Sequence, residues 1–269
     1  MLRIAAVLAT AALAVVPLAG CGEDDINPDA LANAAEATRK QGGVHMTMNG
    51  TVEAQGQKIP MKMEGDADLA KLAMHAKTQA GGGIPEIEMV MLGTTMYMKM
   101  PGLEQAFDGA EWIKMDLQKV GEEMGVDFAQ LMQMGQSSPA EQLKYLKAMS
   151  DLEELGTETI DGVETTHYKG VVDLRKYPDT LPEGEREQAR RNVDKLIELA
   201  GTSTTPTEVW IDEDSLVRRQ KMTMSQKKPV ETKTEMDVRY TDFGKDVDIQ
   251  APENAKDVTD LATKGIAGG

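Results

Sequence analysis

The feature that most restricts the fold of this chain is a set of short segments in which methionine alternates with polar residues. The chain has 19 methionines among 269 residues. Side chains at every second position lie on the same face of a β-strand, so each segment predicts a strand with one apolar face. We expect the following residues on that face and, together, along a ligand-binding cavity: Met46, Met48, Met61, Met63, Met89, Met91, Met96, Met98, Met100, Ile113, Met115, Met222, Met224 and Met236.

Turn residues between the segments favour antiparallel neighbours. Leu92-Gly93-Thr94 separates two methionine segments, and Asp161-Gly162 separates strands expected at 152–160 and 163–173. Asp-Gly is a strong signal for a two-residue hairpin turn. Three last strands are expected near 207–212, 215–226 and 229–243. The pattern predicts about eleven strands in an antiparallel meander.

Other segments change to a helical period. A helix is expected at 28–40, with Asn27 as its N-cap, and a shorter one at 127–134. A third, at 138–150, opens with Ser-Pro-Ala-Glu, which matches a capping box. A fourth opens near Thr180 and ends at Gly201.

These elements predict a single α+β domain over residues 28–252, followed by a loose C-terminal tail at 253–269. A wide sheet with one apolar face must cover that face, and the few helices cannot cover both sides. A sheet of this width also curls. We therefore expect a single large curled antiparallel sheet, a half-barrel of about eleven strands, with helices covering its concave apolar face.

The start of the chain has the pattern of a secretory signal peptide over residues 1–20. Arg3 supplies a positive charge, and the run from Ile4 to Val16 is apolar except for Thr10. This run is shorter than the ~20 apolar residues that a membrane-spanning helix needs. One interpretation is an ordinary cleaved signal that happens to end near a cysteine.

The other interpretation concerns Leu18-Ala19-Gly20-Cys21, which closely resembles the bacterial lipobox. This resemblance implies that the Cys21 thiol is diacylated and that Cys21 becomes the N-terminus after cleavage. Each buried CH₂ contributes ~0.8 kcal/mol, so two acyl chains anchor a protein where one binds marginally. Residues 21–27 would then be a lipidated N-terminus and a short tether. Cys21 is the one cysteine of the chain, so an intramolecular disulfide is excluded.

Charge and motifs argue against several functional classes. The net charge of −16 disfavours nucleic acid and anionic lipid head groups as partners. The histidines, His45, His75 and His167, are far apart in sequence and have no metal-ligand spacing. The chain has no Gly-x-Ser-x-Gly, no phosphate-binding glycine loop and no Ser-x-x-Lys. We expect no enzyme activity, no cofactor and no metal site built on these groups.

Several segments resemble the LppX/LprG-type lipoproteins of actinobacteria, relatives of the LolA and LolB lipoprotein carriers. The segments are Ala32–Thr38, Asp161–Tyr168, Glu208–Asp212, Leu216–Arg219 and Tyr240–Gly244 with Pro252 beyond. The resemblance covers nearly all of the chain after Cys21. It implies an open half-barrel whose cavity holds a lipid or glycolipid, in a protein anchored through acylated Cys21 to the outer leaflet of the cell membrane. An envelope transport partner is part of that expectation.

Two alternatives to a lipid carrier remain from the residues themselves. Methionines on one face also suit a packed core, in a lipoprotein that acts through protein contacts. Repeated Met-x-Met pairs also suit Cu(I), which soft thioethers select. Alternation by itself is what any half-buried strand requires, and it therefore does not favour copper.

Overall fold

The computed structural model describes residues 28–54, 56–83, 85–102, 104–124, 149–181, 183–227 and 231–267. The helical elements are α1 (Pro28–Lys40), η1 (Glu104–Phe107), α2 (Leu117–Met124), η2 (Leu174–Thr180), α5 (Glu183–Ala200) and α6 (Thr259–Ala267). The strands of the first half are β1 (Gly43–Ala54), β2 (Gln57–Asp68), β3 (Ala73–Ala80), β4 (Ile87–Leu92), β5 (Thr95–Lys99) and β6 (Trp112–Asp116). Those of the second half are β7 (Met149–Ile160), β8 (Val163–Asp173), β9 (Thr204–Asp212), β10 (Val217–Gln226), β11 (Thr232–Lys245) and β12 (Lys256–Asp257).

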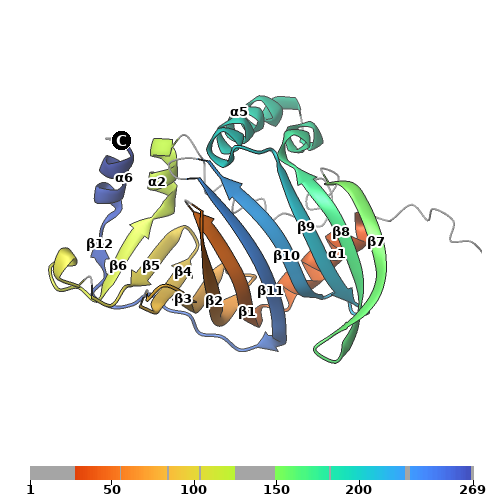
Figure 1. Ribbon diagram of the computed structural model, residues 1–269, viewed down its shortest axis with the longest axis horizontal. Helices are drawn as coiled ribbons and strands as arrows, with labels where there is room; N and C mark the ends of the chain where they lie inside the picture. Colours follow the sequence, from red (N-terminus) through yellow and green to blue (C-terminus); the bar gives the residue numbers. More distant parts are fainter. Residues whose placement is uncertain are drawn as a thin grey trace, which may run out of the picture.

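The strands form one open sheet of 12 strands, in the order β12-β6-β5-β4-β3-β2-β1-β11-β10-β9-β8-β7. Its pairs are antiparallel except for β12, which pairs in parallel with β6. The sheet curls without closing into a barrel (Figure 1). The expected α+β fold with a single curled antiparallel sheet is confirmed.

The turn chemistry read from the sequence accounts for two of the hairpins. Asp161 and Gly162 both have positive φ, 50° and 85°, between the paired residues Ile160 and Val163. Two central residues with positive φ define the turn whose twist matches that of paired strands. Gly93, with φ 56°, lies in the turn that joins β4 to β5.

Glycines in the central strands allow close approach of neighbouring backbones. A Cβ atom at Gly65 in β2 would lie 2.2 Å from the carbonyl oxygen of His75 in β3. A Cβ atom at Gly50 in β1 would lie 2.7 Å from the carbonyl oxygen of Glu235 in β11. Such glycines let strands bend and are a known means of curving a sheet.

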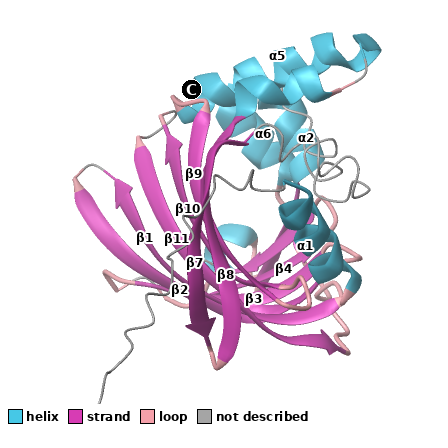
Figure 2. Ribbon diagram, turned by 90° about the vertical axis from the view of Figure 1, so that its right-hand side faces the viewer, coloured by secondary structure: helices cyan, strands magenta, loops and turns pink. Residues whose placement is uncertain are grey.

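Helix α1 packs against the concave side of the sheet (Figure 2). Its Leu31 and Ala34 form a buried cluster with Ile211 of β9. Helix α5 differs from the expectation that the helices lie together against the apolar face. It packs on η2, where Tyr177, Ala189 and Val193 form a separate cluster, and it lies across one end of the sheet.

The loose C-terminal tail expected at 253–269 is wrong for most of its length, because residues 256–267 form β12 and α6. The Asp257 carboxylate accepts a hydrogen bond from the Thr259 backbone N–H at 3.0 Å, which caps α6. The Thr259 hydroxyl accepts another from the Asp116 N–H at 3.0 Å. Val258 and Thr259 are buried. These contacts attach the segment to β6 and α2.

Strand β3 was not expected, since alanines at positions 73, 76 and 80 weaken its apolar pattern. The helices expected at 127–134 and 138–150 lie outside the described residues, apart from Met149 and Ser150, which begin β7. The signal peptide at 1–20 and the tether at 21–27 also lie outside them. Of the helices in the described ranges, none combines the length and the hydropathy needed to cross a bilayer.

Candidate ligand-binding face

Strand pairing places the methionines on one face of the sheet. Directly opposed residues of antiparallel strands project to the same side. One row runs across β3 to β6 through Met74, Met91, Met96 and Met115. The adjacent row begins at Met46 of β1 and crosses the sheet to β6. It contains, in order, Met46, Gly65, Ala76, Met89, Met98 and Ile113. We call this side of the sheet the methionine face.

The other predicted site residues fall on the same face, with one exception. Met48 opposes Met63 across β1 and β2, and Met61 opposes Gly50 in the next row. On the far side of β1, Met236 opposes Gly50 and Met222 opposes Met236. Met224 follows two residues later and is 45% exposed near the end of β10. The exception is Met100, which lies just beyond the end of β5 at Lys99 and outside the paired region.

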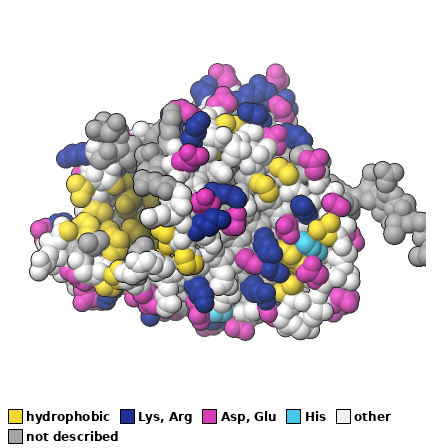
Figure 3. Space-filling view, viewed as in Figure 1, with side chains coloured by type: hydrophobic (Ala, Val, Ile, Leu, Met, Phe, Trp, Pro, Cys, Tyr) yellow, Lys and Arg dark blue, Asp and Glu magenta, His cyan; other side chains and the backbone are white. Residues whose placement is uncertain are grey.

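Most methionines of this face are only partly buried. Met46, which belongs to a buried cluster with Val44 and Ala67, is 8% exposed, and Met48 is 7% exposed. Those of β4, β5 and β6 keep intermediate exposure. Figure 3 shows hydrophobic side chains gathered in a hollowed area over these strands. The methionine face is therefore an accessible apolar surface over β4 to β6.

Uncharged polar groups also lie on the methionine face. Tyr240 opposes Met46, and Gln220 lies between Val209 and Val238. Burial raises the pKa of Tyr240 to about 12, so its phenol is neutral at pH 7. Gln220 and Met74 were absent from the predicted set. Met74 could have been found from its alternation with His75, Lys77 and Gln79.

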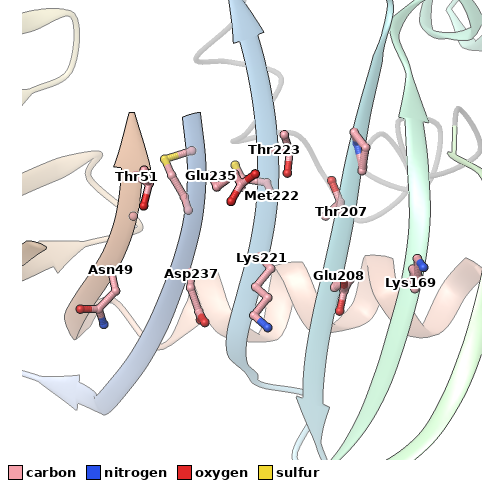
Figure 4. A pocket seen from close by; sticks show the side chains of 13 residues that line it. Asn49, Thr51, Lys169, Thr207, Glu208, Lys221, Met222, Thr223, Glu235 and Asp237 are labelled. Carbon is pink, nitrogen blue, oxygen red and sulfur yellow. The ribbon is translucent and has the colours of Figure 1, made fainter. Parts of the chain in front are cut away.

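The opposite face of the sheet is charged. Across β8 to β11, Lys169, Glu208, Lys221 and Asp237 lie in one row, which Asn49 of β1 continues. These side chains line an open groove of about 440 Å³ (Figure 4). Opposite charges that face each other across strands contribute roughly 0.2–1 kcal/mol each. We call this side the polar face.

The histidines lie on the polar face, each against a carboxylate. His45 Nδ1 is 2.8 Å from Asp66 Oδ1, and His75 Nε2 is 2.7 Å from Glu88 Oε1. His167 Nε2 is 2.9 Å from Glu208 Oε2. Within the described ranges, no group of three or more His, Cys, Asp or Glu side chains could hold a metal ion. Cys21, the predicted lipidation site, is not among the described residues.

Comparison with known proteins first gives a distant relative. No family model matches the chain. The chain is 28% identical over 155 residues to an uncharacterized 31.2 kDa protein of Streptomyces griseus, a match that covers 57% of this chain and 49% of that protein. The chain therefore spans about half the length of the curated relative that it matches.

Solved structures decide the fold. The Mycobacterium tuberculosis lipoprotein LppX matches with a TM-score of 0.51 at 17% identity, over 83% of this chain and 100% of LppX. This chain has the LppX fold. LprF from Mycobacterium bovis matches less closely, with a TM-score of 0.44 at 14% identity over 84% of this chain and 96% of LprF. The expected LppX-type fold is confirmed.

Proposed function

We propose that this protein is an extracytoplasmic lipoprotein that binds a lipid or another hydrophobic ligand on the methionine face, for transport or presentation at the cell envelope. The observation that carries the proposal is an apolar surface that continues across β1 to β6 and stays partly exposed over β4 to β6. The residues that pair in register on this face of β1 to β6 include no charged side chain.

The residue type suits such a ligand. Methionine is unbranched and polarizable, and its side chain adapts to irregular apolar shapes. Proteins with several partners use methionine-rich surfaces for this reason. Each CH₂ of an acyl chain that leaves water contributes ~0.8 kcal/mol, so the ligand's hydrocarbon supplies most of the binding free energy.

The anchor and the location are part of the same proposal. The Leu-Ala-Gly-Cys segment that ends at Cys21 supports acylation and placement at the outer leaflet of the cell membrane. The LppX fold, in a protein named as a lipoprotein, agrees with this. In this role the protein acts by binding and not by catalysis, and it passes its ligand to or from an envelope transport partner.

The test is native mass spectrometry combined with organic extraction, on residues 22–269. This segment contains every element that the structure describes. We expect near-stoichiometric copurified lipid. Met98→Asp should lower the lipid content at least tenfold, because a carboxylate would be desolvated in the middle of the apolar face. Met98→Leu keeps the volume and the hydropathy and should retain the lipid.

Two results would contradict the proposal. One is a wild-type protein that is free of lipid and stays so when phospholipids and glycolipids are offered. The other is a Met98→Asp variant that folds, by circular dichroism, and keeps its lipid. Loss of stability in Met98→Asp with no lipid in any sample would favour the packed-core alternative, in which the protein acts through protein contacts.

A further inference from the structure

Four methionines of the β4–β5 hairpin occupy the corners of a rectangle on the methionine face. Met91 opposes Met96, and Met89 opposes Met98. Opposed Cβ atoms are about 4.5–5.5 Å apart, and residues two apart along a strand are separated by about 6.8 Å. The centre of this rectangle is therefore about 4 Å from each Cβ atom, within reach of every methionine sulfur. Met74 and Met115 extend the row on either side.

We propose that Met89, Met91, Met96 and Met98 bind one soft monovalent cation, Cu(I), at the centre of this rectangle. Neutral, polarizable thioethers select Cu(I) over hard divalent cations. The site is separate in chemistry from lipid binding and goes beyond the proposed function, because it depends on sulfur and not on hydropathy.

Packing alone does not account for methionine at all four positions. On the other face of β4, one position is occupied by a buried apolar side chain. That residue is Val90, which is 4% exposed, and it is not a methionine. β-Branched and aromatic residues are the ones that strands favour. The four methionines lie on the methionine face instead and remain partly exposed, so that an ion can reach this side of the hairpin.

Charge also favours a cation here. The chain has a net charge of −16, which raises the local concentration of cations. Carboxylates that would draw hard ions lie on the other side of the hairpin, where Glu88 opposes Lys99. A thioether has no proton to lose, unlike the cysteine and histidine ligands of other metal sites. Binding should therefore be almost unchanged between pH 5 and pH 7.

The experiment titrates residues 22–269 with Cu(I) held by a coloured chelator, without oxygen and with a reductant present. This segment lacks Cys21 and so contains no competing thiol. Copurified lipid is first removed by detergent washing. We expect one equivalent of Cu(I) to transfer, and the double variant Met91→Leu/Met96→Leu to bind at least 100-fold more weakly.

The matched control is Met222→Leu/Met236→Leu, a second directly opposed methionine pair, on β10 and β11. It should bind Cu(I) within threefold of the wild type. Leucine is close to methionine in volume and hydropathy, so both double variants should fold like the wild type, which circular dichroism and urea unfolding check.

The outcomes separate the two proposals. No transfer of Cu(I) to the wild type, equal weakening in both double variants, or a steep loss of affinity from pH 7 to pH 5 would overturn the copper site and leave lipid binding untouched. Transfer of Cu(I) to a protein that never carries lipid would support the copper site and overturn the lipid carrier.

Discussion

At the scale of single residues, the polar face contains the most deeply buried aromatic side chain of the sheet, Trp210, which is 1% exposed. His167 stacks on it with ring centroids 4.0 Å apart, and the Arg219 guanidinium lies 4.6 Å from its ring. Its indole N–H donates to Glu158 Oε2 at 3.0 Å. The charged side chains of this face thus cover an aromatic ring. This packing accounts for the burial of His167 without a catalytic role.

Arg219 also holds Asp237 in a bidentate pair, with Nε 2.8 Å from Oδ1. Burial alone would raise the pKa of Asp237, but the hydrogen bonds and the charge of Arg219 outweigh it and lower that pKa from its ordinary value of 3.8. A carboxylate with a lowered pKa contributes stability above its unfolded-state pKa, and this contribution is lost as the pH falls through the folded-state pKa.

We therefore predict that Asp237→Asn lowers the free energy of unfolding at pH 7 by about 1.5–3 kcal/mol, the range for hydrogen bonds to charged groups. The difference from the wild type should shrink as the pH falls below about 4, where the Asp237 carboxylate of the unfolded chain becomes protonated. Urea unfolding at pH 7, 4 and 3 measures it. A difference that stays constant over this range would show that the pair contributes nothing through ionisation.

At the scale of elements, the curl of the sheet depends on where the strands carry glycine. Gly65 of β2 is in contact with the backbone of β3, where the Cβ atom of an alanine would also lie 2.6 Å from the Cα atom of Ala76. Gly184 near the start of α5 has no atom within 4 Å of such a position. The two glycines allow the same substitution to be compared with and without close neighbours.

We predict that Gly65→Ala destabilises the protein by about 1–3 kcal/mol or more, because the neighbouring backbone must move. Gly184→Ala should instead stabilise it by about 0.5 kcal/mol, because alanine favours the helix. Chemical unfolding of both variants gives the two values. If Gly65→Ala left the free energy of unfolding unchanged, the backbones of β2 and β3 could move apart without cost. Their close approach would then not contribute to the curl of the sheet.

At the scale of the whole molecule, the sheet divides a hydrophobic concave side from a charged convex side. Helix α1 covers part of the concave side near β9, and α2 and α6 lie together beyond β6 (Figures 1 and 2). The partly exposed methionines lie between these covered regions, on β3 to β6. A hydrophobic ligand would complete the apolar core of the molecule, and an N-terminal acyl anchor would keep the molecule close to a source of such ligands.

The anchor gives a prediction of its own. In cells given labelled palmitate, the full chain should incorporate label and fractionate with membranes, whereas Cys21→Ser should do neither, because it lacks the thiol that would carry the acyl chain. Met98→Leu serves as the control and should be labelled like the wild type. Incorporation of label into Cys21→Ser would show that the acyl group is attached elsewhere.

Much of the fold could be read from local patterns. Alternation marked the methionine strands, Asp161-Gly162 marked a hairpin, and Gly201 marked the end of α5, where its φ is 73°. The apolar pattern was weak in β3, which has alanine at positions where other strands have larger residues. It was also weak in α6, a short helix that depends on contacts with distant residues such as Asp116. Met100 had the right spacing but lies past the last paired residue of its strand.

The sequence by itself determined which residues share a face, because the side-chain direction along a strand is a local property with a period of two. The turn at Gly93 likewise sets the register of the β4–β5 hairpin, which brings Met91 beside Met96 and Met89 beside Met98. Only the tertiary structure decided which strands distant in the chain are neighbours, such as β1 and β11, and in what register they pair. It also buries Trp210 on the charged face and places α5 at the end of the sheet. These last features depend on contacts between residues far apart in the chain, and no local pattern specifies them.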